Sequence, residues 1–376
     1  RWAFPYWQRM PDEELDGCEL LEVSAGDREP ETQRFLGRDI ADDGGPQLRA
    51  LLLPDPGGDR LALKFHHRVA DAGGVKEAAY RLAAIYRALG DDPDHRPEVR
   101  DGSRSLAQVY RRYLPWRLPG LTWRVVKELG PWLWPWRSLQ YPTGRWTGDA
   151  PRFLVHHLDA PRVAAMRAYG RPRGATLNDL LVSGLFRGLA RARGYAGSQT
   201  LRLISTADIR RHLPDRRADA LCNLSGFVLW NLGTELGERF EDTVARVVAR
   251  SRALKDDYLG LVFNLMGFGL VAPWPAAWWR PAMARLFRLE IDTGRLPLML
   301  TNMGPLDADA LDRFGPPVRH AFLVCPAIRE GIAGAGISGF RDTLTITAGT
   351  PESALPLAEL RAFFDGVDGE LPGAPE

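Results

Sequence analysis

The sequence predicts a mixed α/β protein built as an open sandwich of mixed sheets with flanking helices. Its 376 residues are 45% hydrophobic, which gives enough apolar area for the core of two lobes or one large domain. Some segments alternate apolar and polar residues as strands do, whereas others repeat apolar residues at helical spacing. These segments follow one another without the strict βαβ order of a parallel sheet, which favours mixed sheets.

The clearest unit is a strand pair followed by a helix. Strands are predicted over residues 48–53 and 60–67, on either side of a Pro- and Gly-rich turn, and a helix over 75–89. Alternation places the following residues on one face of the second strand: Leu61, Leu63, Phe65 and His67. We therefore expect His67 to project into a partly desolvated cleft, with His66 on the opposite face.

Further elements follow in the second half of the chain. Strands are predicted over 153–157 and 201–207, and a late hairpin over 332–338 and 344–348. Thr176 and Asp179 have the spacing of a helix-capping pair, and leucines at helical spacing follow them. This pattern predicts a helix that begins directly after Thr176.

Charge and cysteine content exclude several classes of protein. Lys and Arg total 49 against 47 Asp and Glu, so a face that binds nucleic acid is not indicated. The three cysteines, Cys18, Cys222 and Cys325, form no C-x-x-C pair, which indicates neither a disulfide framework nor a metal site. We expect a cytoplasmic protein.

Two apolar stretches need separate interpretation. Residues 259–279 carry no charge, but the glycines and prolines within them favour a buried core or the wall of an apolar tunnel over a membrane span. Residues 101–150 are rich in Trp and Pro and are interpreted as a connection between two lobes. Contact of these tryptophans with a membrane surface is the weaker alternative.

The residues that indicate chemistry lie at the end of the second strand. His66, His67, Asp71, Gly73 and Gly74 form the pattern H-H-x-x-x-D-A-G-G. An imidazole can take up and return a proton near neutral pH, as a general base must. We assign that role to His67. Gly73 and Gly74 would let backbone N–H groups approach an oxyanion.

This motif resembles that of the thioester-dependent acyltransferase superfamily, which includes chloramphenicol acetyltransferase, condensation domains and wax ester synthases. Further similar stretches are T-L-N-D at 176–179, D-I-R at 208–210 and L-T-N-M-G-P at 300–305. The resemblance implies two similar α/β lobes around an active-site tunnel, and an ion pair between Asp71 and Arg210. The lobes would be residues 1–100, expected to lack the family's opening strand and helix, and residues 151–376.

The resemblance also implies a reaction. An acyl group would pass from a coenzyme A or carrier-protein thioester to a hydroxyl or amine, with no permanently bound cofactor and no metal. Asn178, Ser205 and Asn302 are candidate substrate-channel residues. The alternatives are a free-standing condensation domain of secondary metabolism, working with a carrier protein, and a catalytically silent scaffold of the same fold.

Two other patterns are interpreted as structural. Gly334, Gly336 and Gly339 spell G-x-G-x-x-G, but a strand rather than a helix is predicted after them, so no dinucleotide site is expected. His156 and His157 repeat the His pair without the following Asp, and we expect ordinary strand residues.

Overall fold

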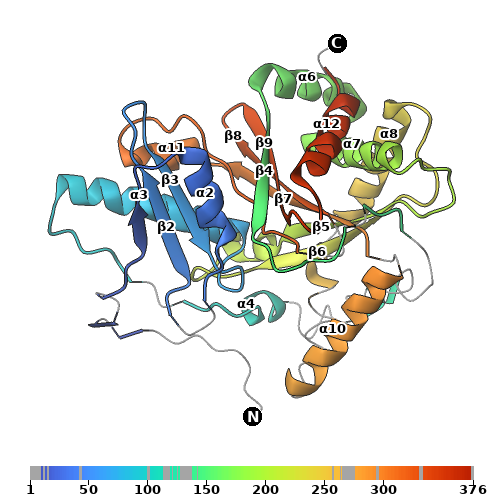
Figure 1. Cartoon of the computed structure of the whole chain (residues 1–376). Coiled ribbons are helices and arrows are strands. Elements are labelled where there is room, and N and C mark those ends of the chain that lie inside the picture. The colour runs from blue at the N-terminus through green and yellow to red at the C-terminus, as the bar shows by residue number, and fades with distance from the viewer. Residues whose placement is uncertain are drawn as a thin grey trace.

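The chain forms two mixed β-sheets with helices packed against them (Figure 1). The computed structural model describes residues 10–11, 13–14, 17–41, 45–99, 102–112, 119–120, 122–124, 126–127, 138–141, 143–255, 258–262, 264, 276–293, 296–329 and 333–373. The mixed α/β class that the sequence predicts is confirmed. In the described residues one sheet has three strands and the other has six, and both are mixed sheets, as predicted.

The smaller sheet has the order β1 (Leu21–Val23), β2 (Leu48–Leu53), β3 (Arg60–Phe65). β1 is parallel to β2, and β2 and β3 form the predicted antiparallel pair. β1 and the helix α2 (Arg28–Gly37) precede this antiparallel pair in the chain.

The face of β3 that packs on α2 carries Ala62 and Lys64. Ala62 packs against a small core formed by Phe35, Leu51 and Leu53, and Lys64 Nζ donates to Phe35 O at 2.8 Å. Leu61, on the opposite face with Leu63 and Phe65, is 39% exposed. Ala62 and the alkyl stem of Lys64 provide apolar surface on the side of α2. Lysine is classed as a polar residue, so the sequence pattern does not indicate this surface.

The larger sheet is made of strands from the second half of the chain. Its order is β4 (Pro151–Leu158), β9 (Thr343–Pro351), β8 (Gly334–Phe340), β7 (Leu298–Leu306), β5 (Arg202–Asp208), β6 (Ser225–Asn231). β7 is parallel to β5 and β8, and the other neighbours are antiparallel. The predicted strands match β4 and β5, and the predicted late hairpin is β8–β9.

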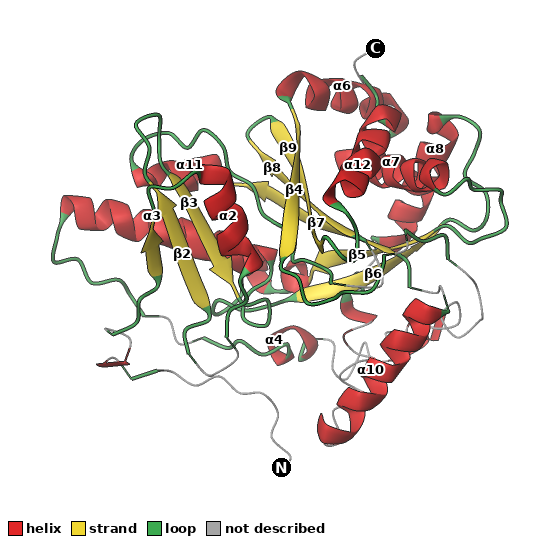
Figure 2. Ribbon diagram, viewed as in Figure 1, coloured by secondary structure: helices red, strands yellow, loops and turns green. Residues whose placement is uncertain are grey.

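Helices cover one face of this sheet and enclose the main core (Figure 2). They are α6 (Ala160–Gly170), α7 (Leu177–Ala192), α8 (Phe240–Leu254) and α12 (Leu357–Glu370). The predicted capping pair is confirmed at the start of α7, where Thr176 and Asp179 bond each other's backbone N–H groups. The sequence analysis did not predict α6, α8, α12 or β6.

Two helices of the first half join the two sheets. Gln33 of α2 exchanges hydrogen bonds with the backbone of Phe153, at 2.8 and 2.9 Å, and so covers the exposed edge of β4. The helix α3 (Ala72–Asp91), predicted over 75–89, packs Val75 and Tyr80 against a cluster that includes Met303 and Phe340 of the larger sheet. The motif, which directly precedes α3, is thus held between the two sheets.

Parts of the two apolar stretches lie outside the described residues, among them 128–137 and 265–275. The described part of the chain contains no helix that is both long and apolar enough to cross a bilayer. The last residues of the uncharged stretch begin the helix α10 (Ala276–Asp292).

Candidate functional site

His67 lies just beyond the strand that was expected to carry it. β3 ends at Phe65, and the chain then turns, with Val69 N donating to His66 O at 2.9 Å. The alternation of strand faces therefore stops before His67. Its side chain is exposed, so the prediction that it lies in a partly desolvated cleft is wrong.

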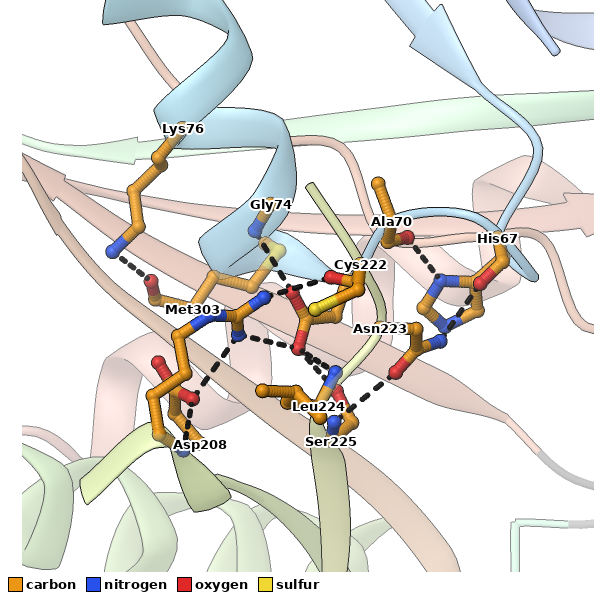
Figure 3. A network of polar contacts seen from close by, with 12 residues as sticks. His67, Ala70, Gly74, Lys76, Asp208, Cys222, Asn223, Leu224, Ser225 and Met303 are labelled. Carbon is orange, nitrogen blue, oxygen red and sulfur yellow. Dashed lines mark hydrogen bonds and ion pairs between the residues drawn. The ribbon is translucent and has the colours of Figure 1, made fainter. Parts of the chain in front are cut away.

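Two hydrogen bonds nevertheless fix the position of His67 (Figure 3). Its Nδ1 lies 3.1 Å from Ala70 O, and Asn223 Nδ2 donates to His67 O at 2.7 Å. A carbonyl oxygen can only accept, so Nδ1 carries the hydrogen in this contact. In the neutral ring, Nε2 is then the nitrogen without a proton, able to accept one.

Asp71, four residues later, has the opposite environment. Its side chain is 3% exposed and forms the predicted ion pair with Arg210, Nη1 to Oδ2 2.8 Å. Oδ1 accepts from Gly74 N at 2.8 Å and so caps α3, and Oδ2 also accepts from Leu224 N at 2.8 Å. Hydrogen bonds from both halves of the chain therefore compensate the buried carboxylate.

Arg210 completes this network from the other side. It bonds Asp208 Oδ1 at 3.1 Å and donates from Nη2 to Cys222 O at 2.7 Å. Burial alone would lower the pKa of the Arg210 guanidinium, but the hydrogen bond and opposite charge of Asp71 outweigh it and raise that pKa. Arg210 therefore remains charged and ties α3 to the ends of β5 and β6.

The two glycines of the motif pack closely, and the N–H of Gly74 is not free to act as an oxyanion donor, whereas that role of Gly73 stays a prediction. The N–H of Gly74 is already bonded to Asp71 Oδ1, so assigning it to an oxyanion is wrong in this structure. A Cβ on Gly73 would lie 2.6 Å from Arg210 Nη1, and one on Gly74 2.9 Å from Cys222 O. Glycine is needed at these positions because the ion pair and the Cys222 carbonyl approach the start of α3.

A further contact links α3 to β7. Lys76 Nζ donates to Met303 O at 3.0 Å (Figure 3) and to Pro305 O at 3.2 Å. Burial lowers the pKa of its ammonium. In the same stretch of β7, Asn302 Nδ2 donates to Asn178 Oδ1 at 2.8 Å, which brings two of the candidate channel residues together.

Ser205 and Cys222 are both buried. Ser205 is buried and its Oγ accepts from Trp230 Nε1 at 2.8 Å; its channel role stays a prediction. Burial raises the pKa of the Cys222 thiol to about 11, so this thiol is protonated and unsuited to act as a nucleophile near neutral pH.

The G-x-G-x-x-G glycines and the pair His156–His157 lie within strands, as expected. The glycines of G-x-G-x-x-G lie within β8, where a Cβ on Gly336 would come within 2.6 Å of Met303 Cε, so the residue serves close packing. His157 Nδ1 lies 3.0 Å from Thr345 Oγ1 between neighbouring strands. Among the described residues, no group of three or more His, Cys, Asp or Glu is placed to hold a metal.

The sequence analysis missed the residues that approach the motif from the segment just before β6. Asn223 and Leu224 bond His67 and Asp71 across 156 and 153 residues of sequence. A polar residue in front of a strand is too common a pattern to single them out. Lys76 was equally without a signal, because nothing in the sequence relates it to the backbone of Met303 and Pro305.

Neither family models nor curated proteins match this sequence. Solved structures do resemble it. The trichothecene 15-O-acetyltransferase from Fusarium sporotrichioides superposes with a TM-score of 0.65 at 13% identity, over 94% of this chain and 76% of that one. SgcC5 from Streptomyces globisporus gives 0.62 at 14% identity, over 95% and 82%.

The first condensation domain of the CDA synthetase also resembles the chain, with a TM-score of 0.60 at 18% identity over 95% of this chain and 76% of that one. Identities this low establish likeness of fold alone. The chain therefore has the chloramphenicol acetyltransferase-like fold that condensation domains share with the trichothecene acetyltransferase, as its motif predicts.

Proposed function

We propose that this protein is an acyltransferase that moves an acyl group from a thioester to a hydroxyl or amine. The observation that carries the proposal is the held, accessible imidazole of His67. Its Nδ1 is occupied by Ala70 O, which leaves Nε2 as the acceptor, and its side chain is exposed to incoming reactants. The fold shared with an acetyltransferase and condensation domains supports this reaction class.

The steps follow from that geometry. His67 Nε2 takes the proton of the acceptor hydroxyl or amine. At the same time the acceptor's oxygen or nitrogen forms a bond to the thioester carbonyl carbon. The resulting tetrahedral intermediate collapses, the carbon–sulfur bond breaks, and the departing thiolate receives the proton from the imidazolium. The products are an ester or amide and a free thiol. The Nδ1 contact with Ala70 O stabilises the imidazolium formed in between.

The buried ion pair positions the base without touching the reactants. The ion pair of Asp71 with Arg210 fixes the C-terminal end of the loop that contains Ala70, and Asn223 fixes its other end by bonding the backbone of His67. We assign Asp71, Arg210 and Asn223 as positioning residues. A shift of the ring by about 1 Å would cost roughly 100-fold in rate.

A second candidate is a free-standing condensation domain that joins carrier-bound intermediates. Similarity to the CDA synthetase condensation domain at nearly the same TM-score as the acetyltransferase supports it. The chemistry at His67 would be the same, and only the source of the thioester would differ.

The experiment is a thiol-release assay with a panel of acyl-coenzyme A thioesters and of hydroxyl and amine acceptors. We expect His67→Ala to lower the rate of thiol release by about 10²- to 10⁴-fold, the usual contribution of a general base. His95→Ala, a histidine in the loop that follows α3, is the matched control and should retain the full rate.

Unchanged release in His67→Ala contradicts the assigned base. Release that requires an acyl-carrier donor in place of acyl-coenzyme A selects the condensation candidate. If no donor of either kind supports release, the silent-scaffold alternative is favoured.

A further inference from the structure

The helix α10 (Ala276–Asp292) stands apart from both sheets at the edge of the molecule (Figure 1). Every described side chain between residues 281 and 289 is exposed. The C-terminal end of the helix is tied to the rest of the chain. There, Leu296 N donates to Glu290 O at 3.2 Å, and the half-buried Glu290 carboxylate interacts with the charge of Arg202 at the start of β5. The preceding turns are therefore accessible to another surface.

Three large apolar side chains lie on this accessible part of α10. Leu286, Phe287 and Leu289 are between 47% and 56% exposed. Leu286 and Leu289 are three residues apart, so they lie side by side on the helix, and Phe287 adjoins Leu286. Helices in proteins gain most of their stability by packing an apolar face against something. These three side chains therefore mark a contact surface.

Basic residues accompany the apolar ones. Arg285 and Arg288 are exposed, and residues 281–289 contain no acidic residue. The two arginines are also three residues apart, so they form a basic stripe along the helix. The acidic residues of α10, Glu290 and Asp292, lie in its last turn, where the helix joins the rest of the chain. The accessible part of α10 is thus both apolar and positively charged.

This combination is typical of a helix that lies in the interface of a lipid bilayer. Such helices bury Phe and Leu side chains about 5–10 Å deep at the boundary of headgroups and acyl chains, and their arginines contact anionic headgroups. A stable protein–protein interface instead takes about 20–30 residues from each partner. The accessible part of α10 spans nine residues, 281–289, which suits a lipid surface better than a second protein.

We propose that α10 is a membrane-contact helix, which places Leu286, Phe287 and Leu289 in the interface of an anionic bilayer. Arg285 and Arg288 then contact the phosphates of the headgroups. The inference is independent of the proposed acyl transfer, because none of these residues takes part in the contacts around His67. Three apolar side chains and two charges give reversible binding that weakens as salt screens the charges.

The test is co-sedimentation of the full chain with vesicles of phosphatidylcholine, alone or mixed with an equal part of phosphatidylglycerol. We expect the wild type to bind the anionic vesicles. The double variant Leu286→Ser/Leu289→Ser should bind them at least about tenfold more weakly, because it loses the burial of two leucines. The matched control is Leu82→Ser/Leu89→Ser, which replaces two leucines of α3 that are 37% and 42% exposed and should bind as the wild type does.

A charge variant provides a second measurement. Arg285→Glu should weaken binding to the anionic vesicles and leave binding to pure phosphatidylcholine unchanged. The proposal is overturned if the wild type binds neither kind of vesicle, or if Leu286→Ser/Leu289→Ser binds as the wild type does. A dimer that this variant dissociates, without vesicle binding, would assign α10 to a second copy of the chain instead. Thiol release measured without vesicles should be unchanged in this variant, so the outcome is separate from that of the proposed acyl transfer.

Discussion

The two ends of the H-H-x-x-x-D motif, four residues apart, have opposite environments. Asp71 is 3% exposed, with partners from α3, Arg210 and β6, whereas His67 is exposed and held by two hydrogen bonds to backbone oxygens. A buried, paired charge contributes to stability in a way that an exposed imidazole does not. Asp71 therefore has a structural role, and the His67 side chain is accessible to reactants.

Removing one partner of the ion pair should have the largest effect on stability. Arg210→Met leaves the Asp71 carboxylate buried without its cation, which costs about 3–5 kcal/mol. We expect a loss of this size in the free energy of unfolding, measured by urea denaturation. Arg211→Met is the control, because Arg211 is exposed and adjacent. A loss below about 1 kcal/mol would mean that the pair does not hold the two sheets together.

Crowding the start of α3 should have a smaller effect. Gly74→Ala places a Cβ 2.9 Å from Cys222 O, and overpacking of this kind costs about 1–3 kcal/mol. Gly90→Ala, in the same helix with nothing within 4 Å of the new Cβ, should instead stabilise the protein by about 0.5–1 kcal/mol. Thermal unfolding of the two variants measures the difference, and equal shifts would show that the close approach at Gly74 is unimportant.

A substitution at His67, the exposed end of the motif, should have the smallest effect on stability. His67→Ala removes an exposed ring with one hydrogen bond to Ala70 O, and we expect less than about 0.5 kcal/mol change in the free energy of unfolding. The same variant is the one expected to lose thiol release. A loss of several kcal/mol would instead make His67 a structural residue, and the contrast between the two ends would disappear.

The sequence was informative where a residue pattern is local. The capping pair Thr176–Asp179, the strand pair before the motif and the hairpin near the C-terminus are all short-range patterns, and the structure contains each of them. The ion pair between Asp71 and Arg210 followed from a family resemblance, because nothing in the spacing of two residues so far apart relates one to the other.

Other features had no such signal. α2 buries only Phe35, so it has no apolar stripe to recognise. The exposure of His67 depends on where β3 stops, and alternation alone does not mark the last residue of a strand. Asn223 holds His67 through one hydrogen bond to its backbone oxygen. Any residue at position 67 would offer that oxygen, so the sequence does not indicate the contact. Such long-range contacts are specified by the folded chain as a whole.

The distance of 139 residues between Asp71 and Arg210 also affects how the protein is made. At about 5–20 residues per second, the ribosome synthesises Arg210 roughly 7–28 s after Asp71. Until then the nascent motif has neither its cation nor the backbone donor of Leu224, and its carboxylate remains hydrated. The loop that contains His67 therefore reaches its final hydrogen bonding only after Arg210 and Leu224 have been synthesised.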